Sequence, residues 1–304
     1  MKIVIMLMLM LLPMGMKAQE FIRLWDGVRM PNSRGVEVKD SIARERWFKV
    51  SSPGMYVFAP SSEENKHAAV LIVPGGGYVK LAYDISGLQL AKWFNTMGIT
   101  AFVLIHRMPG SPDCVEGYKA PLQDAQRAIR YIRAHADRYA IDTTKIGVMG
   151  SSAGGHVASS VSNIDLDWSR AGDEMDRFGF KPDFTILVSP VINMDGEWAH
   201  KGSRDNLLGK SPRRELLELF SIDKQVTAST PPAFMVHATN DPVVPSMNSI
   251  LYYSALRRAG VAGASIHIFP EGKHSIALRN NPGSTMLWVQ LCEEWLKEIG
   301  VLHT

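Results

Sequence analysis

Short runs of consecutive apolar residues alternate with amphipathic segments along most of the chain after residue 66. Unbroken apolar runs of four to seven residues are typical of strands buried on both faces, as in a parallel sheet. Six such runs occupy residues 68–73, 99–105, 145–149, 184–188, 233–236 and 265–269. Between them, apolar residues recur every three or four positions, which predicts helices with one apolar stripe. The stripes are Leu122, Ala125, Ile129, Ile132 and Ala136; Tyr252, Ala255 and Leu256; and Leu287, Leu291, Trp295 and Ile299.

This alternation predicts an α/β fold: one doubly wound domain with a mostly parallel sheet, spanning residues 19–304. Short antiparallel strands are expected to lead into it at residues 47–50 and 55–59, since Ser51-Ser52-Pro53-Gly54 between them is typical of a hairpin turn. In doubly wound sheets, reactive groups gather at the carboxyl ends of the strands. The residues that follow the predicted strands are therefore the candidates for chemistry.

The first eighteen residues differ from the rest of the sequence. Met1-Lys2 gives a positive start, residues 3–16 are almost entirely apolar, and Met16-Lys17-Ala18 resembles a small-residue cleavage site. This apolar run is too short to cross a bilayer comfortably, and its Pro13 and Gly15 argue against a buried helix. We therefore predict a signal peptide at residues 1–18 and a secreted or periplasmic protein. Because no cysteine follows the apolar run, we expect no lipid anchor in a membrane.

The charge of the chain argues against a polyanionic partner. The 304 residues carry a formal net charge of +3, and removal of residues 1–18 with Lys2 and Lys17 leaves +1. A nearly neutral protein has no electrostatic footprint for nucleic acid or for an anionic membrane. The basic cluster of Arg127, Arg130 and Arg133 is expected to be one solvated helix face.

The two cysteines, Cys114 and Cys292, are too few for a disulfide framework. Neither has a CxxC partner or a metal-ligand neighbour, so we predict no metal site and two ordinary buried thiols. One bridge between them remains open at this stage.

The strongest chemical signal lies at Gly150-Ser151-Ser152-Ala153-Gly154, which matches the G-x-S-x-G pattern. An apolar strand precedes it, and a helix rich in Ala and Val follows. The pattern predicts a tight strand-to-helix turn that holds Ser152 in a strained conformation, with glycine required where strand and helix nearly touch. A Walker phosphate loop would need Gly-Lys-Ser/Thr, which is absent. We expect Ser152 to be a nucleophile rather than part of a flexible glycine turn.

A serine on such a turn requires an acid and then a histidine, in that chain order, each in a loop after a strand. Asp241 follows the predicted strand at residues 233–236 and its continuation, where its carboxylate can accept the Nδ1–H of an imidazole. His274 follows the strand at 265–269 through a glycine-containing loop. Asp195 is the alternative acid, less favoured by its position. The interpretation predicts activity that rises with pH through one histidine-like ionisation.

The remaining histidines fit other roles better. His237 and His267 lie within predicted strands, which favours packing or surface alternation over catalysis. His156 lies one turn into the helix after Ser152 and is expected to be structural, although it could line the pocket. His200 could contact substrate.

Three glycines end the first buried strand, in Pro74-Gly75-Gly76-Gly77-Tyr78. A glycine run there can direct backbone N–H groups at one spot, and together with the Ala153 N–H it can stabilise the oxyanion of a tetrahedral intermediate. A dinucleotide loop would need G-x-G-x-x-G with an acidic residue about twenty positions on, which this sequence lacks.

These motifs resemble the esterase branch of the α/β-hydrolase fold, in particular bacterial acetylxylan-esterase-like carbohydrate esterases. The resemblance covers residues 67 to 300 and is carried by residues 74–78, 121–128, 146–156, 240–245 and 272–274. It implies Ser152, Asp241 and His274 as a triad, and Gly76, Gly77 and Ala153 as oxyanion donors. Many relatives in the hormone-sensitive-lipase branch have histidine where this chain has Pro74, which separates it from that branch.

The expected function is hydrolysis of a carboxylic ester through a covalent acyl-enzyme, with no metal or organic cofactor. From the resemblance, the acyl group is small, with acetyl favoured, and the substrate is an acylated plant-type polysaccharide or oligosaccharide. Candidate sugar contacts are Tyr78, Trp198, His200 and Arg204, although the segment that holds the last three can equally be a surface cap.

Two alternatives stay open. A serine peptidase of the prolyl-oligopeptidase type shares this catalytic domain but usually carries a large propeller, and only about 50 residues precede the core here. A non-catalytic binding protein on the same fold would be marked by a broken triad, and no member is missing.

Overall fold

The computed structural model describes residues 19–274 and 276–302, so the predicted signal peptide at 1–18 lies outside the described residues. The strands are β1 (Phe21–Arg23), β2 (Ser41–Ala43), β3 (Arg46–Lys49), β4 (Gly54–Phe58), β5 (Ala68–Val73), β6 (Ile99–Ile105), β7 (Ile146–Ser151), β8 (Phe184–Val188), β9 (Ala233–Ala238) and β10 (Ser265–Phe269). The α-helices are α1 (Gln89–Thr96), α2 (Ala120–Ala134), α3 (Ala153–Asn163), α4 (Lys201–Leu208), α5 (Arg214–Leu219), α6 (Met247–Arg258) and α7 (Trp288–Glu298).

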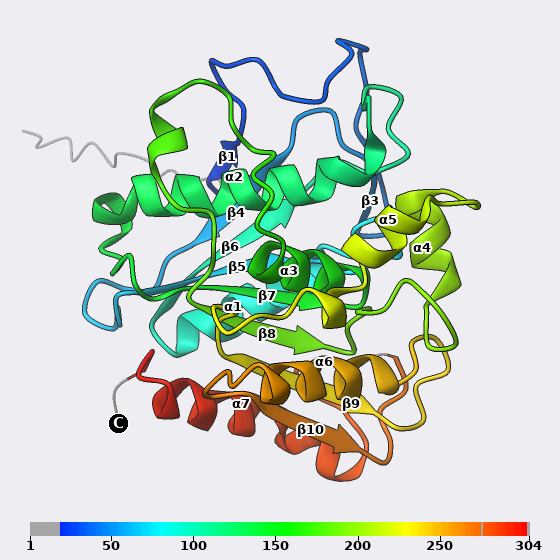
Figure 1. Ribbon diagram of the computed structural model, residues 1–304. Helices are drawn as coiled ribbons and strands as arrows, with labels where there is room; N and C mark the ends of the chain where they lie inside the picture. Colours follow the sequence, from blue (N-terminus) through cyan, green and yellow to red (C-terminus); the bar gives the residue numbers. More distant parts are fainter. Residues whose placement is uncertain (1–18, 275, 303–304) are drawn as a thin grey trace, which may run out of the picture.

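Eight strands form one sheet in the order β1-β4-β6-β5-β7-β8-β9-β10 (Figure 1). The six strands from β6 to β10 in this order are parallel to their neighbours, whereas β4 pairs antiparallel with both β1 and β6. The predicted mostly parallel sheet with short antiparallel leading strands is confirmed. Parallel pairing brings the carboxyl ends of β7, β8, β9 and β10 to one edge of the sheet.

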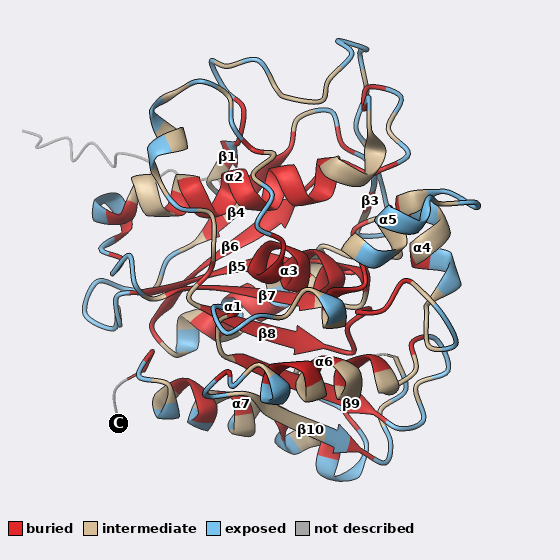
Figure 2. Cartoon of the chain, viewed as in Figure 1, coloured by how far each residue is buried: buried red, intermediate tan, exposed pale blue. Residues whose placement is uncertain are grey.

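Helices cover both faces of the sheet, and alternate residues of β5 show how the core is divided. Ala69, Leu71 and Val73 pack into one apolar cluster with α2, α3 and α6, whereas Ala68, Val70 and Ile72 pack into another with α1 and α7. Figure 2 shows the central strands buried between these two layers. Burial on both faces explains why these strands are continuous apolar runs in the sequence.

The two leading strand segments do not form the hairpin that the sequence predicted. β3 pairs with β2 in a separate two-stranded sheet, while β4 joins the main sheet. The Ser51–Gly54 turn therefore carries the chain from one sheet to the other. The reason lies in packing, since Met55 and Val57 of β4 enter the large core, whereas Trp47 of β3 joins a small apolar cluster of its own.

Two further expectations about burial were wrong. β10 is an edge strand with only β9 beside it, so most of its residues are partly exposed rather than buried on both faces. In α7 the buried stripe is Trp288, Cys292, Trp295 and Leu296, while Leu287 is exposed before the helix begins. Both differences depend on which neighbour covers each face, which the period of apolar residues does not specify.

The arginines of α2 are not a solvated face. Arg127 and Arg130 are buried, Arg127 pairs with Asp173, and Arg130 pairs with Asp167 and Asp176. The segment between α3 and β8 folds over α2 and brings these carboxylates to the guanidinium groups. Buried charges are tolerated because each one is paired and hydrogen-bonded.

Cys114 and Cys292 are both buried free thiols, which settles the question of a bridge between them. Of the helices in the described ranges, none has the length and apolar character needed to cross a membrane.

Candidate active site

Ser152 lies in a strained turn between β7 and α3, with φ 55° and ψ −124°. Positive φ is uncommon for a residue other than glycine and persists only where the surroundings enforce it. A Cβ on Gly150 would lie 2.2 Å from the Gly154 carbonyl oxygen, and a Cβ on Gly154 would lie 2.1 Å from that of Val73. Strand and helix thus approach too closely for any side chain at either glycine, as the sequence predicted.

The structure brings Ser152, His274 and Asp241 together from three different loops. His274 Nε2 lies 2.8 Å from Ser152 Oγ, and His274 Nδ1 lies 2.7 Å from Asp241 Oδ2. Asn240 Oδ1 accepts a hydrogen bond of 2.9 Å from the Lys273 N–H, which ties the loop after β9 to the loop after β10. The imidazole is therefore held between a hydroxyl and a carboxylate.

Four hydrogen-bond donors contact the two carboxylate oxygens of Asp241. The N–H groups of Val243 and Val244 donate to Oδ1 at 2.8 and 2.9 Å, and His274 and His237 contact Oδ2 at 2.7 and 3.2 Å. Burial alone would raise the pKa of this carboxyl, but the hydrogen bonds from both histidines and both N–H groups outweigh it and hold the pKa well below its usual range. Asp241 is thus ionised at neutral pH. The alternative acid, Asp195, pairs instead with Arg214 and Lys224.

His237 belongs to this constellation, although the sequence suggested only a packing role. It is fully buried in β9, its Nε2 lies 2.9 Å from the Val244 carbonyl oxygen, and its Nδ1 lies 2.9 Å from Ser249 Oγ. Since a carbonyl oxygen only accepts, Nε2 carries the hydrogen and also faces Asp241. The sequence contains one indication of this role for His237. A polar ring in a strand predicted to be buried on both faces must have hydrogen-bond partners nearby.

The three predicted oxyanion donors lie in two segments next to Ser152. Ala153 begins α3 directly after Ser152, and Gly76 and Gly77 adopt positive φ in the loop after β5. Within the described residues, none of these three N–H groups donates to another protein atom, so all remain available. Asn206 of α4 donates to the Gly77 carbonyl oxygen at 2.8 Å and fixes that peptide. A Cβ on Gly75 would lie 2.7 Å from the Ser151 carbonyl oxygen, so the glycine loop packs directly against the serine turn.

A cavity of about 580 Å³ opens over Ser152. Its lining includes Arg46, Gly75, Gly76, Gly77, Val79, Lys80, Ser151, Ser152, Val188, His200, His274, Ile276 and Trp288. Of the four proposed sugar contacts, only His200 lies here. Its Nδ1 accepts hydrogen bonds from the Ser203 N–H and hydroxyl at 3.3 and 2.8 Å, which leaves the hydrogen on Nε2. Burial, and then the neighbouring His274, lower the pKa of His200.

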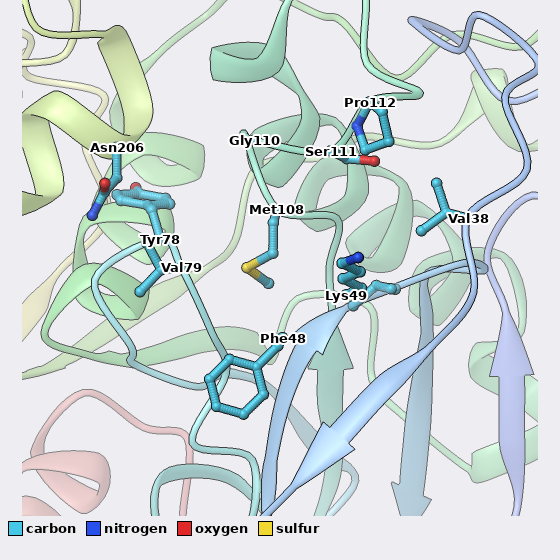
Figure 3. Close-up of a pocket in the computed structure, with 11 residues that line it drawn as sticks. Val38, Phe48, Lys49, Tyr78, Val79, Met108, Gly110, Ser111, Pro112 and Asn206 are labelled. Carbon is cyan, nitrogen blue, oxygen red and sulfur yellow. The ribbon is translucent and has the colours of Figure 1, made fainter.

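The other predicted contacts lie elsewhere. Trp198 lines neither this cavity nor the next, and Arg204 pairs with Asp205. Tyr78 is buried, and its hydroxyl lies 2.6 Å from His156 Nδ1. The Tyr78 side chain lines a second cavity of about 240 Å³ beyond Val79, beside Phe48 and Met108 (Figure 3). Tyr78 therefore lines the second cavity and not the one over Ser152, because the loop directs its hydroxyl to His156.

His156 is structural, as expected from the sequence. Its burial makes the folded protein less stable at acid pH. Its Nε2 bonds the Phe220 carbonyl oxygen at 2.8 Å, and burial lowers its pKa to about 4. The unfolded chain then binds a proton that the folded chain does not, so stability is full above about pH 6.5 and falls as pH drops towards 4. The expected loss from this residue is about 3 kcal/mol.

This loss can be measured by urea unfolding between pH 7 and pH 4. His156→Gln should be less stable at pH 7 but should lose less stability on acidification than the wild type. His67→Gln, at an exposed histidine, should keep the wild-type slope. Equal slopes in all three proteins would contradict the assignment.

No group of three or more His, Cys, Asp or Glu side chains suited to a metal ion occurs in residues 19–274 and 276–302.

Known proteins are similar to this chain in sequence and in structure. The BD-FAE family model matches residues 55–256. Endo-1,4-beta-xylanase B of Butyrivibrio fibrisolvens is 35% identical over 229 residues, which are 75% of this chain and 35% of that protein. The acetylxylan esterase of Xylanibacter ruminicola is 33% identical over 250 residues, which are 81% of this chain and 47% of that protein. The chain therefore spans about a third to a half of the length of these curated relatives.

Among solved structures, an acetyl ester-xyloside bifunctional hydrolase from Caldicellulosiruptor lactoaceticus superposes with a TM-score of 0.77. It is 33% identical in sequence, and the match covers 93% of this chain and 97% of that chain. The likeness thus extends over nearly the whole of both chains, including the elements that surround Ser152.

Proposed function

Because this chain belongs to the BD-FAE family and to the α/β-hydrolase esterases, we propose that it hydrolyses small acyl esters, with acetyl favoured, on xylan-type polysaccharides or oligosaccharides. The observation that carries this proposal is the chain of contacts from Ser152 through His274 to Asp241 beside three free backbone N–H groups. We further propose that residues 19–304 form one catalytic domain and that residues 1–18 direct it to the cell exterior or periplasm.

In the proposed mechanism, His274 Nε2 takes the proton of Ser152 Oγ as the oxygen attacks the ester carbonyl. Asp241 accepts the Nδ1–H of His274, which fixes the tautomer and stabilises the imidazolium that forms. The N–H groups of Gly76, Gly77 and Ala153 hold the oxyanion, at about 3–4 kcal/mol per donor by mutational loss. His274 then protonates the leaving alcohol, and water activated by the same imidazole releases the acid.

The proposed preference for a short acyl group rests on the relatives. The names of two relatives refer to acetyl esters: one is an acetylxylan esterase and the other an acetyl ester-xyloside bifunctional hydrolase. In this chain, Arg46, Lys80 and His200 line the cavity over Ser152. Apolar side chains such as Leu90, Val188 and Trp288 line it as well, so the short acyl group is proposed from the relatives.

A substrate panel tests the proposal. We expect kcat/KM for 4-nitrophenyl esters to fall at least about tenfold from acetate to octanoate, a difference of about 1.4 kcal/mol in transition-state stabilisation. Acetate should be released from acetylated xylan, and peptide 4-nitroanilides should not be cleaved. Cleavage of the anilides would favour the peptidase alternative, and inactivity on every ester would favour a binding protein.

A further inference from the structure

Two cations line the cavity over Ser152, and no carboxylate does. Arg46 lies at the start of β3, and Lys80 lies in the loop that follows the three glycines. Among the described residues that line this cavity, none is Asp or Glu. Among all described residues, no carboxylate oxygen lies within the 4.0 Å ion-pair distance of the Arg46 or Lys80 side chain. Neither cation is therefore paired with a carboxylate of the described residues.

The backbone places these two cations on one face. Trp47 and Leu81 form an antiparallel bridge, with N–H to oxygen distances of 3.0 and 2.8 Å in the two directions. Their side chains point into the small apolar cluster. Because side chains alternate along extended backbone, Arg46 and Lys80 lie on the opposite face, towards the cavity.

Other contacts hold this face beside the oxyanion glycines. Arg46 Nη1 donates to the Arg44 carbonyl oxygen at 2.5 Å, and a Cβ on Gly76 would lie 3.0 Å from Lys80 Cγ. The neighbouring acids in the sequence, Glu45 and Asp84, do not line the cavity, and Asp84 accepts a hydrogen bond from Gln89.

We propose that Arg46 and Lys80 bind a carboxylate on the alcohol portion of the ester, so that the enzyme favours acyl esters on glycans that carry a uronic acid. The inference rests on the proposed function, since it assumes that the ester carbonyl lies at Ser152. A cleft lined by charges of one sign concentrates ligands of the opposite sign, and a guanidinium pairs with a carboxylate in bidentate geometry.

The second cavity extends the same surface for the rest of such a glycan. Val79 lines both cavities, and beyond it lie Phe48, which is 40% exposed, and a further cation, Lys49 (Figure 3). An exposed aromatic ring next to cations suits a carboxylated sugar, because the ring covers the apolar face of the sugar while the cations meet its charge.

Two aryl acetates of similar shape, one with a charged and one with a neutral leaving group, test the proposal. 4-Acetoxybenzoate carries a carboxylate, and 4-acetoxybenzamide carries a neutral amide of similar shape. After division by the rate of each ester with hydroxide, kcat/KM should favour the carboxylate about tenfold at low ionic strength, a difference of about 1.4 kcal/mol. The preference should largely disappear in 0.5 M NaCl, since salt screens charges that remain in contact with solvent.

In the double variant Arg46→Gln/Lys80→Gln the preference should disappear, so that the normalised kcat/KM values of the two esters become equal. Lys92→Gln provides the matched control, since this exposed lysine of α1 does not line the cavity. Equal hydrolysis of both esters by the wild type, or an unchanged preference in the double variant, would overturn the inference alone. Hydrolysis of neither ester would overturn the proposed function as well.

Discussion

Ser152→Ala is expected to lower kcat for 4-nitrophenyl acetate by about 10⁴- to 10⁶-fold, because no other hydroxyl is held 2.8 Å from His274 Nε2 within the described residues. The fold should survive, since alanine at φ 55° carries about the same strain as serine and Ser152 makes no side-chain cap for α3. The activity that remains would come from substrate binding and the oxyanion donors.

Ser160→Ala is the matched control for this prediction. Ser160 lies on the same helix, is 1% exposed, and its hydroxyl has no hydrogen-bond partner among the described residues. Its removal should leave kcat unchanged and should not destabilise the protein.

A fluorophosphonate probe adds a direct readout by mass spectrometry: the wild type and Ser160→Ala should gain one adduct at residue 152, and Ser152→Ala should gain none. Full activity in Ser152→Ala would refute the nucleophile.

The period of apolar residues carried most of the information about the fold. Buried strands such as β5 and β6 are covered on both sides, so every position except Thr100 is apolar and the run is visible in the sequence. The edge strand β10 lacks a second neighbour and alternates polar Ser265 and His267 with apolar residues, but composition alone does not reveal the order of strands in a sheet. The small β2–β3 sheet escaped prediction for the same reason.

Some features of the candidate site could be predicted from local sequence patterns, and others could not. The nucleophile turn, the glycine loop and the order Ser, Asp, His leave local patterns, because each requires particular residues at fixed spacing. Contacts between side chains that lie far apart in the sequence leave no such local pattern. Tyr78 follows the glycine loop, but nothing in the local sequence shows that its hydroxyl contacts His156. The period of α2 predicts a solvated Arg127, yet Asp173, 46 residues further on, pairs with it.

Asp241→Asn is expected to lower kcat by about 10⁴-fold, with a much smaller effect on KM. Asparagine matches the shape of aspartate but offers one acceptor oxygen and one NH₂ group. If the oxygen faces His274 and His237, the NH₂ group meets the N–H groups of Val243 and Val244. If the NH₂ group faces the histidines, it opposes the Nε2–H of His237 and forces the proton of His274 onto Nε2, where it blocks proton transfer from Ser152. Either orientation leaves buried donors without acceptors.

The same clash should appear in stability, as a loss of about 1–3 kcal/mol in urea unfolding at pH 7. Asp195→Asn tests the rival carboxylate with the same chemical change. Asp195 pairs with Arg214 and Lys224, both at least 40% exposed, so its replacement should change stability by less than about 1 kcal/mol and leave kcat intact. A collapse of kcat in Asp195→Asn with activity retained in Asp241→Asn would reverse the assignment. Loss of stability alone in Asp241→Asn would make the carboxylate a structural group, because only a partner of the reacting imidazole affects kcat and KM so unequally.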